Sequence, residues 1–223
     1  MAKLIVLEGL DGSGKGTQTA RLAEILRKQG KNVRVIDFPA YESEGCALVK
    51  LYLGGKLGAD PDATNAYAAS MFFAADRYVS YVTGWREDYL SPDTVILANR
   101  YTTANAYHQL SKMPEAEWDS FLAWLWDFEF GKLGLPAPDR VILLDMPESV
   151  STAMVRRRAA ETGRTMDIHE TDEDYLIRCR KAAAYVAEVC GWRVIRCAGE
   201  GADVPDSVEE IGKKVEEAVS DLF

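Results

Sequence analysis

The stretch that decides the fold lies at the start of the chain and reads KLIVLEGLDGSGKGTQ over residues 3–18. An apolar run leads into a turn that contains Gly9, Gly12 and Gly14, and a helical pattern begins at Lys15. Glycines let a backbone curl so that successive N–H groups point inward, and the start of the next helix adds its positive dipole end. The stretch therefore predicts a strand, a phosphate-binding loop and a helix, with Lys15 reaching the phosphates of a nucleotide.

The loop matches the pattern G-x-x-x-x-G-K-[ST] at every fixed position but the last. Gly16 follows the lysine, and a hydroxyl comes one residue later, at Thr17. A hydroxyl at the usual position binds Mg²⁺ directly, so we expect Thr17 or a water molecule to serve here. The residues expected to hold the phosphates are Gly9, Gly12, Ser13, Gly14, Lys15, Gly16 and Thr17.

Four further apolar or alternating runs indicate strands, at residues 32–38, 95–98, 141–144 and 192–197. Continuous Val, Ile and Leu runs are typical of strands buried on both faces of a parallel sheet. Helical patterns cover residues 15–29, 44–53, 62–81, 101–110, 114–130, 147–158, 172–189 and 204–219. Together they predict a single doubly wound α/β domain over residues 1–223, with a five-stranded parallel sheet and helices on both faces.

Composition limits the partners that the protein can have. Hydrophobic residues make up 48% of the chain, enough for a real core, and the net charge is −9. An acidic protein does not suit a nucleic-acid surface, although a local basic cluster is enough for a small phosphorylated ligand. We find no signal peptide and no apolar run of membrane-spanning length, so we expect no membrane partner.

The cysteines indicate a reducing compartment. Cys46, Cys179, Cys190 and Cys197 have neither metal-ligand nor C-x-x-C spacing. We therefore expect reduced, mostly buried thiols and a cytoplasmic protein.

Transfer of a phosphoryl group depends on cations around the transferred group. Arg77 lies on the helix expected at 62–81, and Arg100 directly follows the third strand, where open α/β sheets place their ligands. Asp11 lies inside the loop, where a carboxylate accepts a hydrogen bond from an acceptor sugar, organises a metal or simply forms a turn. Residues 54–60 and 156–170 are expected to project, and the second segment carries enough arginines to act as a lid.

Two residues are candidates for recognising a base. Phe73 precedes Arg77 by one helical turn, so it either stacks on a base or belongs to the core. Asn105 offers both a donor and an acceptor to a base edge.

Taken together, these residues resemble the thymidylate kinase family of nucleoside monophosphate kinases. The segments that carry the resemblance are EGLDGSGK at 8–15, DFP at 37–39, FAADR at 73–77, NRY at 99–101 and LDMP at 144–147. Each motif is short, but their order and spacing agree. The resemblance implies a P-loop NTPase-type domain with a short arginine-rich lid at about residues 156–170, and transfer of the γ-phosphoryl group of ATP to dTMP with Mg²⁺.

The resemblance also implies residue roles. Lys15 would bind ATP, Arg77 and Arg100 the acceptor phosphate, and Asp11 would lie near the sugar. Phe38 and Phe73 would contact the acceptor, with Phe73 stacked on the base and Asn105 at its edge. Thr17 and Asn99 would lie near the metal, and Arg157 and Arg164 would supply charge from the lid.

Departures from the family pattern leave alternatives open. Asn99 replaces an aspartate, Tyr41 lies where an arginine is frequent, and Tyr107 comes one place before the usual tyrosine position, which His108 occupies. The alternatives are a kinase for another nucleoside monophosphate or a deoxynucleoside, and a nucleotide-binding regulatory module with weakened catalysis.

Finally, residues 117–130 form a helix that is apolar on almost every side, including Trp124 and Phe128. Such a helix is buried in its own domain or lies in an interface. We expect a homodimer, without requiring this helix to be the contact.

Overall fold

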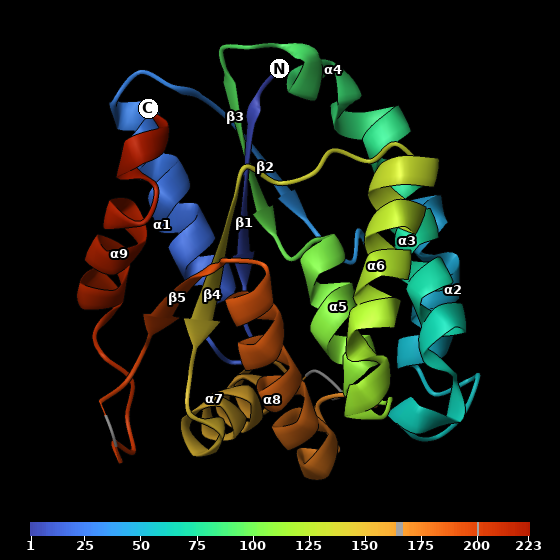
Figure 1. The fold of residues 1–223 in the computed structure, drawn as a ribbon. Coiled ribbons are helices and arrows are strands. Elements are labelled where there is room, and N and C mark those ends of the chain that lie inside the picture. The colour runs from blue at the N-terminus through green and yellow to red at the C-terminus, as the bar shows by residue number, and fades with distance from the viewer. Residues whose placement is uncertain (164–166, 200) are drawn as a thin grey trace.

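A five-stranded parallel sheet forms the centre of the molecule (Figure 1). The computed structural model describes residues 1–163, 167–199 and 201–223. The strands are β1 (Lys3–Glu8), β2 (Asn32–Asp37), β3 (Thr94–Asn99), β4 (Arg140–Asp145) and β5 (Arg193–Arg196). Their order across the sheet is β2-β3-β1-β4-β5, and all neighbours pair in parallel. The loop that follows β1 therefore emerges at the middle of the sheet's carboxyl edge.

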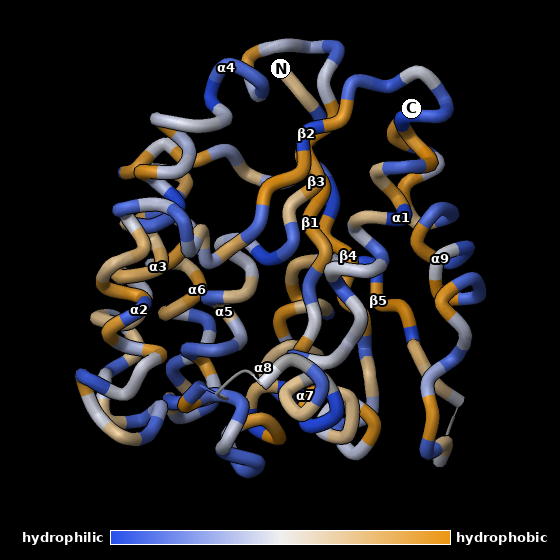
Figure 2. The backbone as a smooth tube through the Cα atoms, turned by 180° about the vertical axis from the view of Figure 1, so that it is seen from behind, coloured by the Kyte–Doolittle hydropathy of each residue, from blue (hydrophilic) through white to orange (hydrophobic). Residues whose placement is uncertain are grey.

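The side chains of β1 alternate between two hydrophobic cores. Ile5 and Leu7 join the core on one face of the sheet, whereas Leu4 and Val6 join the core on the other. All four are fully buried, and the central strands appear as hydrophobic runs in Figure 2. Burial on both faces is what the continuous apolar run in the sequence predicts.

Helices cover both faces. On one face, α1 (Lys15–Lys28) and α9 (Val208–Glu217) pack together and bury Leu22, Leu26 and Ile211 against the strands. The helices on the other face are α3 (Ala66–Ser80), α5 (Thr102–Leu110), α6 (Trp118–Trp126) and α8 (Glu173–Val189). The remaining helices are α2 (Ala47–Leu53), which packs on α3, and α4 (Arg86–Leu90) and α7 (Glu148–Thr162), at opposite ends of the molecule. No helix in the described ranges is long and apolar enough to span a membrane.

The predicted fold class is confirmed, with differences at the ends of helices. The helix expected from residue 62 begins at Ala66, because Asn65 caps it by accepting a hydrogen bond from Ala68 N at 2.9 Å. Its path continues through a π-helical turn at Tyr81–Trp85 into α4, and Trp85 is fully buried against the sheet. A second π-helical turn, Asp127–Lys132, extends α6.

Only part of the segment expected to project at 156–170 does so. α7 runs to Thr162 and carries Arg157, while Arg164 lies outside the described residues. Further along the chain, Ile168 N donates to Leu53 O at 3.3 Å, and His169 is buried. The end of the segment thus packs back against α2, whereas residues 54–60 are largely exposed, as expected.

Candidate active site

The loop between β1 and α1 requires glycine at its turns. Gly12 and Gly14 have φ values of 81° and 85°, in the left-handed region that side chains disfavour. The curled loop brings Lys15 Nζ to within 2.8 Å of Leu10 O, to which it donates. Because Lys15 also begins α1, the positive end of the helix dipole faces the loop.

A cleft of about 570 Å³ opens beside this loop. Its lining brings together thirteen of the residues predicted from the sequence: Asp11, Gly12, Gly14, Lys15, Gly16, Thr17, Phe38, Phe73, Arg77, Asn99, Arg100, Asn105 and Arg157. Gly9 and Ser13 belong to the loop but do not line the cleft. A cleft of this size is typical of a small-ligand site.

Arg100 follows β3 in a left-handed backbone conformation, with φ of 66°. Its N–H donates to Leu7 O at 3.0 Å. Its guanidinium donates from NH2 to Asp11 Oδ1 at 2.8 Å, and from NH1 to Tyr107 Oη at 3.2 Å and to His108 Nε2 at 3.0 Å. A left-handed conformation costs a non-glycine residue about 1 kcal/mol, and such strain is typical of functional positions.

Asp11 remains ionised beside this arginine. Burial alone would raise the pKa of the Asp11 carboxyl, but the charges of Arg100 and Lys15 outweigh it and hold the pKa well below its usual range. Asp11 therefore acts as a hydrogen-bond acceptor at neutral pH, not as an acid.

Glu8 ends β1 with a fully buried carboxylate, which we did not anticipate from the sequence. Its Oε1 accepts hydrogen bonds from Tyr101 N at 3.0 Å and Thr103 Oγ1 at 2.5 Å, and its Oε2 accepts from Tyr107 Oη at 3.0 Å. Glu8 thus ties the strand that leads into the phosphate loop to the start of α5. Arg100 lies between these two attached parts of the chain.

Arg77 forms a buried ion pair with Glu129, in the π-helical turn after α6. Its Nε and NH2 donate to the two carboxylate oxygens at 2.7 and 2.5 Å, and both side chains are at most 2% exposed. Glu129 also accepts from Thr102 Oγ1 at 2.8 Å and Asn105 Nδ2 at 3.1 Å. Sequence reasoning missed Glu129, although an acidic residue between Phe128 and Phe130 in an apolar helix was a usable signal.

The same network orients Asn105. Its Nδ2 donates to Glu129 and to Ser70 O at 3.2 Å, so Oδ1 is the polar atom of this side chain that remains available to accept a hydrogen bond. Asn105 Oδ1 is buried and has no partner among the described residues, and the same is true of both polar atoms of Gln109. Both side chains line the cleft, and Gln109 was also missed from the sequence.

Oxygen atoms suited to Mg²⁺ also line the cleft. Asn99 Nδ2 donates to Asp37 Oδ1 at 2.9 Å, whereas Asn99 Oδ1 is buried without a partner in the described part of the chain. Asp37, Asn99 and Thr17 all line the cleft. The described residues contain no cluster of three or more His, Cys, Asp or Glu that would form an all-protein metal cage. Because Mg²⁺ keeps several waters and binds through few protein oxygens plus phosphates, these oxygens fit it.

α7 attaches the arginine-rich segment to the loop. The hydroxyl of Ser151 donates to Asp11 O, and a side chain at Gly12 would collide with the Ser151 backbone. Further along α7, Arg157 lies exposed at the cleft, with its Nε 3.1 Å from Glu161 Oε1.

The two histidines of the chain also meet in the cleft, which sequence reasoning did not foresee. His108 on α5 stacks on His169, with ring centroids 5.2 Å apart. Tyr52 and Tyr175 flank the pair. Their meeting depends on long-range packing, for which the sequence holds no local signal.

A central phosphate loop in a sheet of order β2-β3-β1-β4-β5, with anchored arginines on the walls of the same cleft, defines the class of P-loop nucleotide kinases. Comparison with known proteins gives the family. The thymidylate kinase family profile matches residues 7–208. A thymidylate kinase of Mycobacterium tuberculosis is 34% identical over 195 residues, which cover 85% of this chain and 87% of the relative.

A thymidylate kinase of Arabidopsis thaliana is 29% identical, with 98% of this chain and 71% of the relative covered. Among solved structures, a thymidylate kinase from Candida albicans has the same fold, with a TM-score of 0.68, 17% identity, and coverage of 99% of this chain and 92% of that one. The chain belongs to the thymidylate kinase family.

The buried ion pair generates a stability prediction. Replacing Glu129 by Gln should lower the free energy of unfolding by about 3 kcal/mol or more, because Arg77 is left as a buried charge without its counter-ion. Urea denaturation followed by circular dichroism measures the change. Asp127→Asn is the matched control, since it breaks an exposed pair with Lys132 in the same π-helical turn and should change stability little. Equal losses in the two variants would contradict this account.

Asp167 generates a pH prediction. Burial, together with the charges of Asp11 and Glu170, raises its pKa to about 6. The folded state therefore disfavours the ionised form, and the contribution of Asp167 to stability falls as the pH rises from about 4 to about 6. Asp167→Asn keeps an oxygen for the N–H groups of His169 and Glu170, but it does not ionise.

The variant should therefore match the wild type near pH 4 and exceed it by up to about 3 kcal/mol above pH 7. Urea denaturation across this pH range measures the difference. A difference that is independent of pH would contradict the assignment. Asp203→Asn, at an exposed site, serves as the control.

Proposed function

We propose that the protein transfers the γ-phosphoryl group of ATP to dTMP, giving dTDP and ADP. The observation that carries the proposal is one cleft with a glycine-rich phosphate loop on one side and two anchored arginines, Arg77 and Arg100, on its walls. Membership of the thymidylate kinase family supports the same reaction.

The donor binds to the loop. Backbone N–H groups of residues 12–17 and the start of α1 provide positive potential for the phosphates of ATP. Lys15 already lies across the loop, where it neutralises the β- and γ-phosphates. Arg157, on α7, also lines the cleft and adds positive charge.

The acceptor binds to the part of the cleft that Arg77, Arg100 and Phe73 line. Arg100 and Arg77 favour a charged acceptor, hence a monophosphate over a nucleoside. Phe73 contributes an aromatic face for the base, and Phe38 and Asp11 also line the cleft.

The geometry of Asn105 bears on the identity of the base. Its amide donors are used by Glu129 and Ser70, so it offers only its oxygen to the cleft. An oxygen acceptor requires an N–H group on the base edge. Thymine provides this group at N3, whereas the N3 of cytosine is itself an acceptor and would face Asn105 unpaired.

The chemistry is mainly a matter of positioning and charge. An oxygen of the acceptor phosphate attacks the γ-phosphorus, and the bond from that phosphorus to the β–γ bridging oxygen breaks, so that ADP leaves. The monophosphate is largely ionised at neutral pH, so the attack requires no general base. This agrees with Asp11 being held by Arg100 as a hydrogen-bond acceptor.

We include Mg²⁺ in the proposal. Asp37, Asn99 and Thr17 would hold it, directly or through water, and the ion would neutralise charge on the phosphates. We also propose a cytoplasmic location, because all four cysteines are free thiols and such thiols persist in reducing compartments.

The function is tested by an assay of ADP release with ATP, Mg²⁺ and the acceptors dTMP, dUMP, dCMP, dGMP, AMP, UMP and thymidine. We expect the highest kcat/KM with dTMP, and a lower value with dCMP than with dUMP. Lys15→Ala should lower kcat by about 100-fold or more, because transition-state charge loses its cation.

Lys28→Ala, at the exposed end of the same helix, is the matched control and should be fully active. Full activity of Lys15→Ala would overturn the mechanism. ATP binding without turnover of any acceptor would favour the regulatory module instead.

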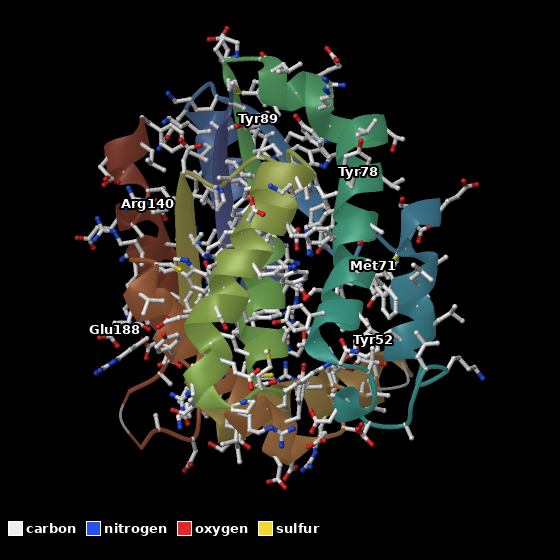
Figure 3. The ribbon with its side chains drawn as sticks, turned by 45° about the vertical axis from the view of Figure 1, so that its right-hand side comes forward. Tyr52, Met71, Tyr78, Tyr89, Arg140 and Glu188 are labelled. Carbon is white, nitrogen blue, oxygen red and sulfur yellow. The ribbon has the colours of Figure 1, made fainter. Side chains whose placement is uncertain are left out.

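We further propose a homodimer that forms through α3. Tyr67, Met71, Tyr78 and Val82 follow one face of this helix and its continuation, and each is 44–50% exposed. Figure 3 shows Met71 and Tyr78 along the same helix, and Leu48 and Leu51 of α2 add to the exposed apolar surface. Trp124 of α6 packs under Tyr67, with ring centroids 4.7 Å apart. Contiguous apolar surface of this kind marks an interaction site.

Light scattering at micromolar concentration should give twice the mass of the chain. Met71→Glu should shift the protein to monomer, because it places a charge inside the contact. Val208→Glu, on α9 at the other face of the sheet, is the control and should leave the dimer intact. A wild-type protein of monomer mass would contradict the proposal.

A further inference from the structure

His108 connects the arginine of the acceptor side to the protein interior. Its Nε2 lies 3.0 Å from Arg100 NH1, and its Nδ1 lies 3.1 Å from Tyr175 Oη. The His108 side chain lines the cleft, yet the residue is only 6% exposed. The ring therefore bridges from the cleft to α8.

The partners of His108 determine which nitrogen carries the proton. An arginine only donates hydrogen bonds, so Nε2 must accept from Arg100 and the proton must reside on Nδ1. Tyr175 Oη then accepts from Nδ1, and its own proton goes to His108 O at 3.2 Å. Burial, together with the charges of Arg100 and His169, lowers the pKa of His108 well below its usual value, so the ring is neutral.

His169 supports the ring from behind. The two imidazoles stack with an interplanar angle of 19°. Lys112 Nζ donates to Tyr52 Oη at 2.7 Å, and Tyr52 Oη lies 2.9 Å from His169 Nε2. Tyr52 and Tyr175 thus fix the two rings from two different helices.

These contacts restrict the guanidinium of Arg100. Of its five N–H groups, three are directed to Asp11, Tyr107 and His108. Two remain for a ligand in the cleft, and the three contacts fix the plane in which those two lie. Loss of His108 as an acceptor would remove one of the three contacts that restrain the orientation of the guanidinium.

We propose that His108 is a positioning residue, which orients Arg100 so that its remaining N–H groups meet the phosphate of the acceptor. The inference rests on the proposed function, because it concerns the same acceptor. It goes beyond that function by assigning the orientation of the arginine to a histidine that does not itself carry the phosphate. The competing interpretation is that His108 contacts the nucleoside part of the acceptor.

The two interpretations differ in how binding depends on the phosphate. Calorimetric titration measures the Kd of thymidine and the Kd of dTMP, two ligands that differ only in the phosphate. The ratio of the first Kd to the second measures how much binding depends on the phosphate. His108→Phe keeps an aromatic ring for stacking but has no acceptor. We expect it to weaken dTMP binding by about tenfold or more, with thymidine binding changed less than twofold.

Three further variants sharpen the test. His108→Gln restores an acceptor and should recover most of the dTMP affinity. Tyr175→Phe removes the nearer partner of Nδ1 but leaves Cys179 Sγ at 3.4 Å, so it should lower the dTMP affinity alone and by a smaller factor. Lys28→Ala, at the exposed end of α1 and away from the cleft, is the control and should bind both ligands as the wild type does. In kinetics, His108→Phe should raise the KM for dTMP without changing the KM for ATP.

Equal weakening of dTMP and thymidine in His108→Phe, or no weakening of dTMP, would overturn the inference. If His108→Phe fails to fold, His108→Gln decides the question. The inference is overturned if His108→Gln lowers the ratio of the thymidine Kd to the dTMP Kd as far as Arg100→Ala does. A wild-type protein that binds dTMP no more tightly than thymidine overturns it as well. Failure of the proposed function has a different signature, namely that the wild type forms no dTDP.

Discussion

The site depends on the buried carboxylate of Glu8. The phosphate loop and the acceptor arginine belong to different strands, and a parallel sheet only fixes those strands up to their carboxyl ends. Glu8 fixes the chain beyond that edge, because its carboxylate accepts hydrogen bonds from the backbone N–H of Tyr101 and the hydroxyls of Thr103 and Tyr107. A buried carboxylate is costly unless donors surround it, and these three donors come from one short segment. The requirement to satisfy Glu8 therefore holds α5 against β1, with Arg100 between them.

The protein is acidic, yet its cleft presents cations to phosphates. Arg100 and Arg77, which both line the cleft, have separate carboxylate partners, Asp11 for Arg100 and Glu129 for Arg77. These partners reduce the net charge of the cleft but fix the direction of each guanidinium. Directed N–H groups recognise a phosphate through geometry as well as charge, so the acidic composition of the whole chain and the affinity of its cleft for anions are compatible.

The sequence allowed the fold class to be predicted because its signals are local. The run before Gly9 specifies a strand buried on both faces, and glycines with Lys15 specify the loop. Arg100, at the end of a strand, could be assigned to the cleft from topology, whereas Asn99 was assigned only through the family resemblance and Asp37 was not assigned. The places of His169 and Gln109 could not be predicted, because they depend on how distant helices pack. Glu129 gave a local signal as an acidic residue in an apolar helix, but its pairing with Arg77 depends on the same packing. Helix boundaries also shifted where a cap such as Asn65, or a buried side chain such as Trp85, outweighed the periodicity.

The contact between Ser151 and the phosphate loop determines which side of α7 faces the loop. Ser151 is fixed to Asp11 O, and Arg157 lies six residues later on the same helix. Six residues of helix span about 9 Å, and each residue turns the helix by about 100°. A single residue inserted or deleted between them would therefore move Arg157 very little along the helix axis but would rotate its side chain away from the cleft. The number of residues between Ser151 and Arg157 is consequently constrained by the direction in which Arg157 must point.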